Sequence, residues 1–520
     1  MTKQKSDPVF KPYVMNQMRL MPQSYDEKIP SGHLVRLVNE AIDALDLAVL
    51  EEQYAGGGTS SYHPRMMLKI LVYAYCKKIY TSRKIAEALE ENIHFMWLSG
   101  EQTPDFRTLN DFRGRRMKTV IDEVFSLVVE QLVAKGYIKL ENYFVDGSKV
   151  EADANKHKVV WEKRRARYEG NVKAQIKELL AVIEAENAQE QAEYGEKDLE
   201  SKGGGGSGEE TAQVLRETVR ALNERLKGER SKSTREAFKK LEKDCLPRLE
   251  KYETQKDVLA GRNSYSKTDP EATCMRMKED RGAEKAWPKP AYNVQLGTEG
   301  QFVVGYSVHN QSSDPVTLIP HLKKLKHLPK NMVADAAYGS EENYAYLEEH
   351  QIGNYLKYTT FYQDTHRYRN PEIIRKHQFR ADHFEYDSQS DEFICPNQQR
   401  LTYLYTGKHK TTNGYESERR YYGCQSCQDC PLKSQCTQAK GNRRIQVSFK
   451  LLEYRRQARE NLTSESGVAL RKKRAVDVET VFGDIKQNMR FRRFHLRGLE
   501  KVNTEWGLVC IAHNMRKLAS

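Results

Sequence analysis

The sequence has 520 residues, which allows two or three domains and at least one full-sized hydrophobic core. Lys and Arg number 85 against 72 Asp and Glu, which leaves a formal net charge of +13 at pH 7. This charge favours a polyanionic partner such as nucleic acid, although charge alone does not identify one. No segment reaches the roughly 18 consecutive apolar residues of a membrane span, and the first residues lack the apolar stretch of a signal peptide. We therefore expect a cytoplasmic, nucleoid-associated protein with no membrane contact.

Residues 1–138 are predicted to form a helical domain. Apolar residues recur at helical spacing in SGHLVRLVNEAIDAL and PRMMLKILVYAYCKKIY, and the segments TSRKIAEALEENIHFMWLSG and TPDFRTLNDFRGRRM add shorter helices. Two short helices with Arg and Lys beside the turn suit a helix-turn-helix reader of DNA, with contacts from Arg83, Lys84 and Arg107. The alternative is a plain helical bundle with a solvated basic face.

The pattern changes to strands at Tyr143, where YFVD is predicted to be a short apolar strand ending at Asp146. AYNVQLGTEGQFVVGYSVHN predicts a β-hairpin, DPVTLIPHLKKL a helix, NMVAD a strand ending at Asp335, SEENYAYLEEHQ a helix and NYLKYT a strand. Two insertions interrupt this order. Without them, an α/β domain remains that we expect to have the mixed sheet of the ribonuclease-H fold, formed by residues 139–154, 266–360 and 450–520.

The first insertion, residues 155–265, is predicted to be a charged antiparallel helical hairpin, available for dimer contacts or for touching DNA. Its helices carry two apolar stripes, formed by Val172, Ile176, Leu179 and Ile183 and by Val214, Leu222 and Leu226. Between the stripes, EYGEKDLESKGGGGSGEET is predicted to be a flexible connector. Its GGGGS at 203–207 looks like an engineered linker, and the sequence leaves open whether it is native.

The second insertion, residues 361–449, is polar, rich in tyrosine and partly β, and it holds five of the nine cysteines. Zn²⁺ is bound by four thiolates or imidazoles in a tetrahedron, and CxxC pairs bring two thiolates within reach. In a reducing compartment such clustering favours a metal over disulfides. We expect a structural Zn²⁺ on four of the five, with the favoured set Cys395, Cys424, either Cys427 or Cys430, and Cys436. The alternative is a reduced cluster without metal.

Three acids on separate elements are the candidates for catalysis. Asp146 and Asp335 each close a predicted strand, although an acid in that place can also be a simple turn former. Glu479 lies among apolar residues on a late helix, and Lys486 follows two helical turns later on the same face. Asp484 is a rival for the third acid, but it lies away from that line. Three such carboxylates could hold two Mg²⁺ (or Mn²⁺) ions that activate the attacking oxygen and stabilise the leaving oxygen of a phosphodiester.

Cations follow Glu479 and precede it in the run RKKR at 471–474. We expect them to contact DNA phosphates, the candidates being Arg474, Lys486, Arg490, Arg492 and Arg493. Four further polar residues lie in segments that could approach the acids without a chemical role of their own, namely Asp269, Lys278, Tyr292 and Asn293.

The segments VDGSKVEADANK, KPAYNVQL, ADAAYGSEENYAYL and VETVFGDIKQNMRFRRF resemble those of DDE transposases from bacterial insertion sequences. The closest resemblance is to the branch with an N-terminal helical domain and a cysteine-bearing insertion before the final glutamate. It runs from about residue 15 to 518 and maps the family's acids onto Asp146, Asp335 and Glu479. The family's Tyr and Arg before the glutamate match imperfectly, since Arg474 lies five residues before it and Arg471 eight.

The resemblance implies metal-dependent cleavage at the inverted-repeat ends of an insertion sequence, after which the freed 3′ hydroxyl attacks target DNA. It also implies a homodimer on double-stranded DNA. Two other functions are a ribonuclease-H-like nuclease that cuts without joining and a non-catalytic, transposase-derived DNA-binding regulator. The presence of all three acids argues against the regulator. The end and target sequences and the route of second-strand cleavage stay open.

Overall fold

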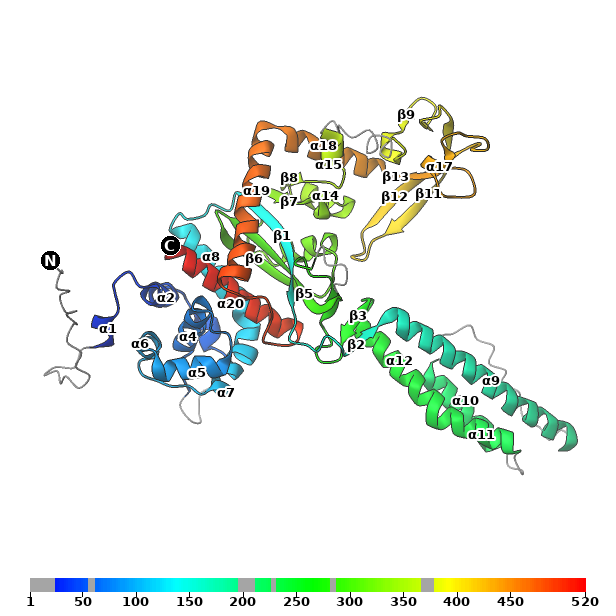
Figure 1. Cartoon of the computed structure of the whole chain (residues 1–520), viewed down its shortest axis with the longest axis horizontal. Coiled ribbons are helices and arrows are strands. Elements are labelled where there is room, and N and C mark those ends of the chain that lie inside the picture. The colour runs from blue at the N-terminus through cyan, green and yellow to red at the C-terminus, as the bar shows by residue number, and fades with distance from the viewer. Residues whose placement is uncertain (1–23, 55–60, 195–210, 226–230, 281–286, 366–377) are drawn as a thin grey trace, which may run out of the picture.

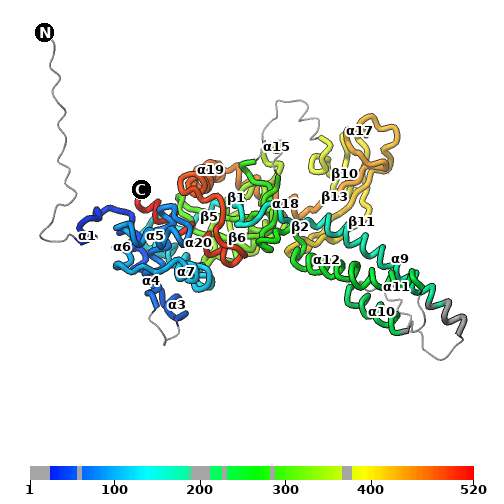
Figure 2. The backbone as a smooth tube through the Cα atoms, turned by 60° about the horizontal axis from the view of Figure 1, so that its bottom comes forward, coloured from blue at the N-terminus to red at the C-terminus, as the bar shows by residue number. Residues whose placement is uncertain are grey.

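The computed structural model describes residues 24–54, 61–194, 211–225, 231–280, 287–365 and 378–520 (Figure 1). A group of helices from the N-terminal part lies at one end of an elongated molecule, and a central sheet follows it. Two arms extend from the sheet region away from these helices, and Figure 2 shows the same order from a second direction. Within the described parts, no helix is both long and apolar enough to cross a bilayer.

The N-terminal part is helical, as predicted. Its helices are α1 (Tyr25–Lys28), α2 (Leu34–Asp43), α3 (Ala48–Glu51), α4 (Pro64–Cys76), α5 (Ser82–Glu91), α6 (Ile93–Ser99), α7 (Phe106–Asp111) and α8 (Met117–Ala134). They do not form a core of their own, because α4 and α8 pack against the C-terminal helix α20 (Leu499–Leu518). Nearly every side chain of α20 from Val502 to Met515 is buried in this shared core.

The central sheet is mixed, as predicted from the order of elements. Its strands are β1 (Asn142–Glu151), β4 (Thr273–Met275), β5 (Lys289–Glu299), β6 (Phe302–His309), β7 (Asn331–Ala334) and β8 (Gly353–Leu356). They run in the order β4-β5-β1-β7-β8, and β6 pairs with β5. Strands β1, β7 and β8 are parallel, whereas β5 is antiparallel to β1. The accompanying helices are α13 (Leu318–Lys323), α14 (Glu341–Glu349), α15 (Phe361–Thr365), α18 (Phe449–Thr463) and α19 (Glu465–Gly483).

One strand boundary differs from the prediction. Strand β1 does not end at Asp146 but continues to Glu151, because residues 146–151 keep pairing with β5. The parallel pairing of β1 with β7, in contrast, ends at the pair Val145 and Ala334. Asp146 is therefore the first residue of β1 beyond that parallel pairing.

The first arm is a helical bundle with its own apolar core (Figure 2). A short antiparallel pair, β2 (Val159–Trp161) with β3 (Ser264–Ser266), forms its base. Its helices are α9 (Glu162–Tyr194), α10 (Ala212–Arg225), α11 (Lys232–Lys240) and α12 (Leu246–Leu259), the last two joined by a π-helical turn. The insertion is helical as predicted, but its described residues form more than a two-helix hairpin, because α11 and α12 follow the helix α10 that carries the second apolar stripe. Val214 is exposed and Leu215 is buried in its place, while Leu226 and GGGGS lie outside the described residues.

The second arm is a five-stranded antiparallel sheet in the order β13-β12-β11-β10-β9. Its core is small and holds Phe393, Leu401 and Tyr422 together with the buried Cys424 and Cys427. The elements are β9 (Glu385–Asp387), β10 (Glu392–Ile394), β11 (Arg400–Lys410), β12 (Glu416–Cys424), α17 (Lys433–Cys436) and β13 (Arg444–Val447).

Candidate active site

Asp146 and Asp335 lie side by side on neighbouring parallel strands. Each directly follows one member of the last register pair, Val145 and Ala334. Adjacent strands are about 4.8 Å apart, so the two aspartates stand at the same level of the sheet. Asp146 Oδ1 accepts a hydrogen bond from the Gly147 amide at 2.9 Å, and Asp335 Oδ1 accepts one from the Ala336 amide at 2.6 Å.

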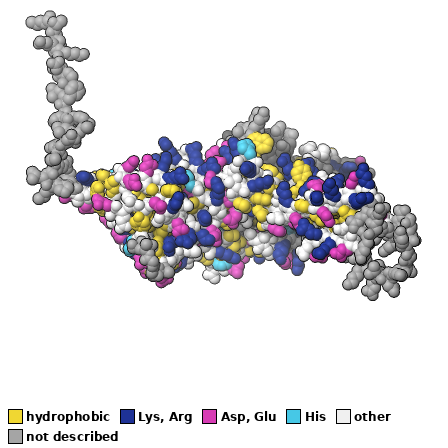
Figure 3. Space-filling view, turned by 90° about the horizontal axis from the view of Figure 1, so that it is seen from below, with side chains coloured by type: hydrophobic (Ala, Val, Ile, Leu, Met, Phe, Trp, Pro, Cys, Tyr) yellow, Lys and Arg dark blue, Asp and Glu magenta, His cyan; other side chains and the backbone are white. Residues whose placement is uncertain are grey.

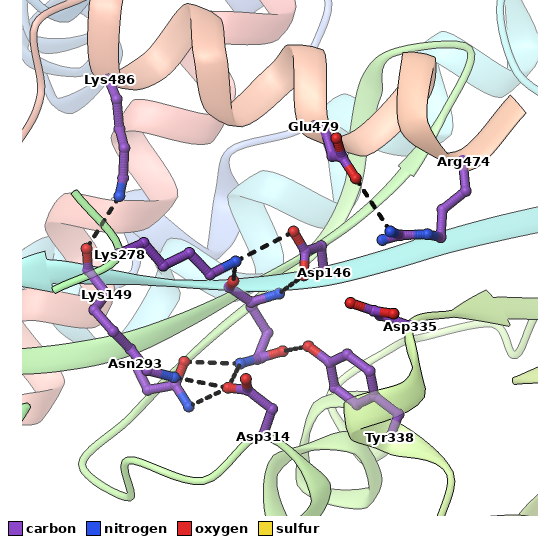
Figure 4. Close-up of polar contacts among 12 residues, drawn as sticks. Asp146, Lys149, Lys278, Asn293, Asp314, Asp335, Tyr338, Arg474, Glu479 and Lys486 are labelled. Carbon is purple, nitrogen blue, oxygen red and sulfur yellow. Dashed lines mark hydrogen bonds and ion pairs between the residues drawn. The ribbon is translucent and has the colours of Figure 1, made fainter. Parts of the chain in front are cut away.

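Glu479 is positioned above the aspartates by α19, which packs across β1, β5 and β7 (Figure 4). Buried Val478, Val481 and Phe482 fix this helix on the sheet, which leaves the Glu479 side chain 54% exposed. Arg474 Nη2 donates to Glu479 Oε1 at 3.1 Å, and Figure 4 places its guanidinium between Glu479 and Asp335. All three predicted acids therefore face one site, with a cation among them.

Burial disfavours the charged form of Asp146, which neighbouring cations partly compensate. Burial raises the pKa of Asp146, and the charge of Asp335 adds to that effect, while the charges of Lys278 and Arg474 oppose it. Lys278 Nζ lies 3.5 Å from Asp146 Oδ2 and donates to the Gly147 carbonyl at 2.6 Å. Arg474 is buried, and its Nε and Nη1 have no hydrogen-bond partner among the described residues. The site thus offers unused guanidinium donors beside its acids.

The donor set of the site suits Mg²⁺ or Mn²⁺, because it consists of carboxylate oxygens without thiolate or imidazole. The acids do not yet form a cage, since no three His, Cys, Asp or Glu side chains in the described ranges are placed to hold a metal ion. The negative charge of the acids and the donor type fit a divalent cation. In this structure, Glu479 is paired with Arg474 instead.

Lys486 points toward β1 from the same side as Glu479 (Figure 4). It lies in a π-helical turn, Asp484–Asn488, that continues α19, and its Nζ contacts Glu279 at 2.6 Å and the Lys149 carbonyl at 3.2 Å. The rival acid Asp484 faces α20 instead, with its Oδ2 2.8 Å from His513 Nδ1. Asp484 is therefore not part of this site.

The other predicted phosphate contacts are partly occupied by protein groups. Arg493 pairs with Asp153 at 3.1 Å, and Arg492 donates to the Lys486 carbonyl at 3.2 Å. Arg490 is exposed and forms no ion pair within the described parts of the chain. Lys and Arg side chains are interspersed with acidic and apolar ones on the face shown in Figure 3, so no single basic patch dominates it.

The N-terminal cations line a cleft of about 520 Å³ between α5 and α7 on one side and Asp153 and His495 on the other. The guanidinium groups of Arg83 and Arg107 lie 5.0 Å and 5.7 Å from the ring centre of Phe106, and neither forms an ion pair with a described residue. Lys84 is exposed on the same helix as Arg83.

The two walls of this cleft are fixed to each other by buried contacts. Tyr80 donates from its hydroxyl to the Met489 carbonyl at 2.5 Å, and Arg113 donates to the Tyr80 carbonyl at 2.6 Å. The fully buried Glu505 accepts from the His495 amide at 2.9 Å and balances the charge of Arg113. The cleft therefore has a set position relative to the central sheet.

The five clustered cysteines surround one small cavity of about 20 Å³, and all of them are free thiols. Burial raises the pKa of Cys424 to about 11, and the neighbouring Cys427 adds to the shift. Their positions do not yet meet metal-ligand geometry in the described part of the chain. The lining cysteines are Cys395, Cys424, Cys427, Cys430 and Cys436.

Sequence reasoning gave no role to several residues near the acids. Lys278 touches Asp146, and Asn293 belongs to a buried polar cluster with Gln295 and Asp314 behind the strand. A signal for this cluster was present in β5, where the polar residues Asn293 and Gln295 alternate with the apolar residues Tyr292, Val294 and Leu296. Asp314 carried no such signal, because it lies in a loop.

Two family models match the chain. One, described as "Transposase domain (DUF772)", matches residues 23–115, which hold most of the N-terminal helices. The other, described as "Transposase DDE domain", matches residues 394–519, which include Glu479 and α18 to α20. A search of curated proteins and a search of solved structures found no match. Of the three acids that face one site, Glu479 lies inside the second match, and Asp146 and Asp335 lie between the two matches. The two family-model matches support a DDE transposase of an insertion sequence.

Proposed function

We propose that this protein is a DDE transposase that binds the inverted-repeat ends of an insertion sequence and catalyses metal-dependent DNA cleavage and strand transfer. The catalytic residues are Asp146, Asp335 and Glu479. The observation that carries the proposal is that Asp146 and Asp335 each follow the last register pair of adjacent parallel strands, beneath Glu479 on α19.

The strand arrangement supports a ribonuclease-H-like catalytic domain. Strands β6, β5, β1, β7 and β8 follow one another across the sheet, with β5 antiparallel to its neighbours and β1, β7 and β8 parallel. In that fold, acids at the ends of the central parallel strands and on a final helix share one edge. Residues 155–265 and 361–449 then count as insertions into this domain.

The proposed chemistry uses the cations that now neutralise the acids. Two bound Mg²⁺ or Mn²⁺ ions would activate the attacking oxygen and stabilise the leaving oxygen, with Asp146, Asp335 and Glu479 as their ligands. Arg474 releases Glu479 and turns its unpaired Nε and Nη1 toward oxygens of the scissile phosphate. Lys278 leaves Asp146 in the same way and neutralises a phosphate next to the site. In this scheme, Arg474 and Lys278 neutralise the acids in the free protein and the DNA phosphates in the complex.

DNA binding is assigned to the cleft lined by Arg83 and Arg107, with Lys84 beside it. These cations lie without ion-pair partners among described residues, which suits phosphate contacts. The further predicted phosphate contacts lie near Glu479 in the sequence, namely Arg474, Lys486, Arg490, Arg492 and Arg493. Because transposition brings two ends together, a homodimer on double-stranded DNA is part of this proposal.

A structural Zn²⁺ in the second arm is also part of the proposal. Five thiols around one cavity of about 20 Å³ support it, because four thiolates satisfy tetrahedral zinc. Binding would hold Cys395, before β11, to the segment after β12, and so stabilise an arm whose apolar core is small. Four of the five cysteines suffice, with Cys427 and Cys430 as alternatives for one place.

The test uses labelled end DNA, a target plasmid and Mg²⁺ or Mn²⁺. We expect Asp146→Asn, Asp335→Asn and Glu479→Gln each to abolish cleavage while DNA binding persists, and Asp484→Asn on the neighbouring turn to keep cleavage per folded molecule. Cleavage without joined product would favour the nuclease. Cleavage that survives in Asp335→Asn would remove the proposed role of the acids.

A further inference from the structure

A buried polar cluster lies behind the candidate active site, on the other face of the sheet. Successive residues of a strand point to opposite faces, so Gly147 and Lys149 face away from the Asp146 side chain. Their register partners on β5 are Gln295 and Asn293. With Asp314 and Tyr338, these side chains form what we call the Asp314 network, which consists of Lys149, Asn293, Gln295, Asp314 and Tyr338 (Figure 4).

The Asp314 network is a chain of hydrogen bonds that ends at Oδ1 of Asp314. Asp314 Oδ1 accepts from Lys149 Nζ at 2.7 Å and from Asn293 Nδ2 at 2.8 Å. Gln295 Nε2 donates to Asn293 Oδ1 at 2.9 Å, and it lies 3.5 Å from the same Asp314 oxygen. These bonds fix both amide groups, because each NH₂ faces an acceptor. The carbonyl oxygen of Gln295 is thereby presented to the Tyr338 hydroxyl, which donates to it.

The network connects the two strands that carry the catalytic aspartates. Tyr338 ends the short turn that starts at Asp335, so its bond to Gln295 fastens this turn to β5. Gln295 packs directly under Gly147, where any added Cβ would collide with its amide. Gly147 directly follows Asp146. The Gln295 amide therefore contacts the backbone next to Asp146 and also bonds Tyr338 in the turn that starts at Asp335. Asn343 on α14 donates to the Tyr338 carbonyl at 2.8 Å and to the Pro315 carbonyl at 3.0 Å, which joins the Asp314 loop to that turn.

A purely structural role would not require this arrangement. Gln295 and Asn293 are fully buried and Tyr338 is 1% exposed, so the cluster costs desolvation that apolar residues would avoid. A fully satisfied polar cluster, however, holds one geometry where an apolar core allows several. Metal ligands need such support, because groups behind them set their orientation.

We propose that Asp314 and Tyr338 are positioning residues that set the spacing of Asp146 and Asp335 for divalent metal binding. The inference rests on the proposed function, because the metal is the one that these acids would hold. The Asp314 carboxylate orients the amides of Asn293 and Gln295, and Gln295 transmits that orientation to the Asp335 turn through Tyr338. Neither Asp314 nor Tyr338 touches metal or DNA in this scheme.

The test measures Mn²⁺ binding to the full-length protein without DNA, from the electron paramagnetic resonance signal of free Mn²⁺. Tyr338→Phe removes one hydroxyl and keeps the ring, and Asp314→Asn keeps the shape but removes the charge. We expect each to weaken Mn²⁺ binding by about 10- to 100-fold. The matched control is Tyr344→Phe on α14, which removes a buried hydroxyl bonded to the Leu356 carbonyl outside the network and should bind Mn²⁺ like the wild type.

The double variant tests whether the two residues act in one chain. If they do, Tyr338→Phe with Asp314→Asn binds Mn²⁺ no more weakly than the poorer single variant. Multiplied effects, or equal losses in Tyr338→Phe and the Tyr344→Phe control, would overturn the inference in favour of general destabilisation. The variant Asp335→Asn distinguishes a failure of the positioning role from a failure of the proposed function. If it loses Mn²⁺ while Tyr338→Phe does not, only the positioning role fails, and if it binds normally, the proposed function and the positioning role both fail.

Discussion

Arg474 gives a prediction in which stability and activity change in opposite senses. Its guanidinium is buried, it bonds Glu479, and two of its donors have no acceptor among the described residues. Arg474→Met keeps most of the side-chain volume while it removes the charge. The partner left behind, Glu479, is 54% exposed, so water can solvate its carboxylate.

The expected magnitudes follow from these contacts. An ion pair with an exposed partner contributes about 0–1 kcal/mol. A buried donor without an acceptor costs about 1–3 kcal/mol, and Arg474 has two of them. Loss of its attraction for Asp146 offsets part of that relief. We therefore expect the free energy of unfolding of metal-free Arg474→Met to equal that of the wild type or to exceed it by about 1 kcal/mol. Cleavage should fall by about 10²- to 10³-fold, because donors for the charged phosphate are lost.

The assay combines urea unfolding with cleavage of labelled end DNA. The control is Arg113→Met, because Arg113 is equally buried but donates to Tyr80 and Tyr75 and balances the fully buried Glu505. Its removal strands a buried carboxylate, and we expect a loss of about 3–5 kcal/mol. If Arg474→Met were destabilised as much as the control and cleaved normally per folded molecule, Arg474 would be a structural residue and its assignment to phosphate would be wrong.

Three more predictions follow from the same contacts. Burial raises the pKa of Asp146, so its charged form disfavours folding at neutral pH. Metal-free Asp146→Asn should therefore be more stable than the wild type at pH 7, and this gain should shrink as the pH falls through the raised pKa. A gain in urea unfolding that does not depend on pH would contradict this reasoning. Arg83→Ala and Arg107→Ala should each reduce the slope of log affinity against log salt by about 0.9, as measured by fluorescence anisotropy on end DNA, whereas the exposed Lys330→Ala should leave the slope unchanged. Elemental analysis should find one zinc per chain, lost in four of the five single Cys→Ala variants of the second arm; no zinc in freshly purified protein would refute the site.

The sequence predicted the elements that carry the acids because their patterns are local. Asp335 closes a short apolar strand, and Glu479 lies on a helix whose neighbours Val478 and Val481 are apolar and buried, so both signals can be read in a window of a few residues. The end of β1 was misplaced at Asp146. Its continuation to Glu151 depends on pairing with β5, which is more than a hundred residues away in the chain.

The roles of Arg474 and Asp314 depend on contacts between distant segments. Arg474 appeared as one residue of a basic run expected to face DNA, and only the packing of α19 on the sheet buries it beside the acids. Asp314 bonds residues of β1 and β5 from a loop without periodicity. The docking of the N-terminal helices on α20 was likewise not predicted, because an amphipathic helix does not specify which partner its apolar face will meet.

The most direct test of the catalytic assignment is a structure of the protein with Mn²⁺ and end DNA, in which anomalous scattering locates the metal. We expect Mn²⁺ bound by Asp146, Asp335 and Glu479 next to the scissile phosphate, with Arg474 moved from Glu479 to a phosphate oxygen. Mn²⁺ bound elsewhere, with Glu479 still paired to Arg474 and the phosphate remote from both aspartates, would contradict the assignment.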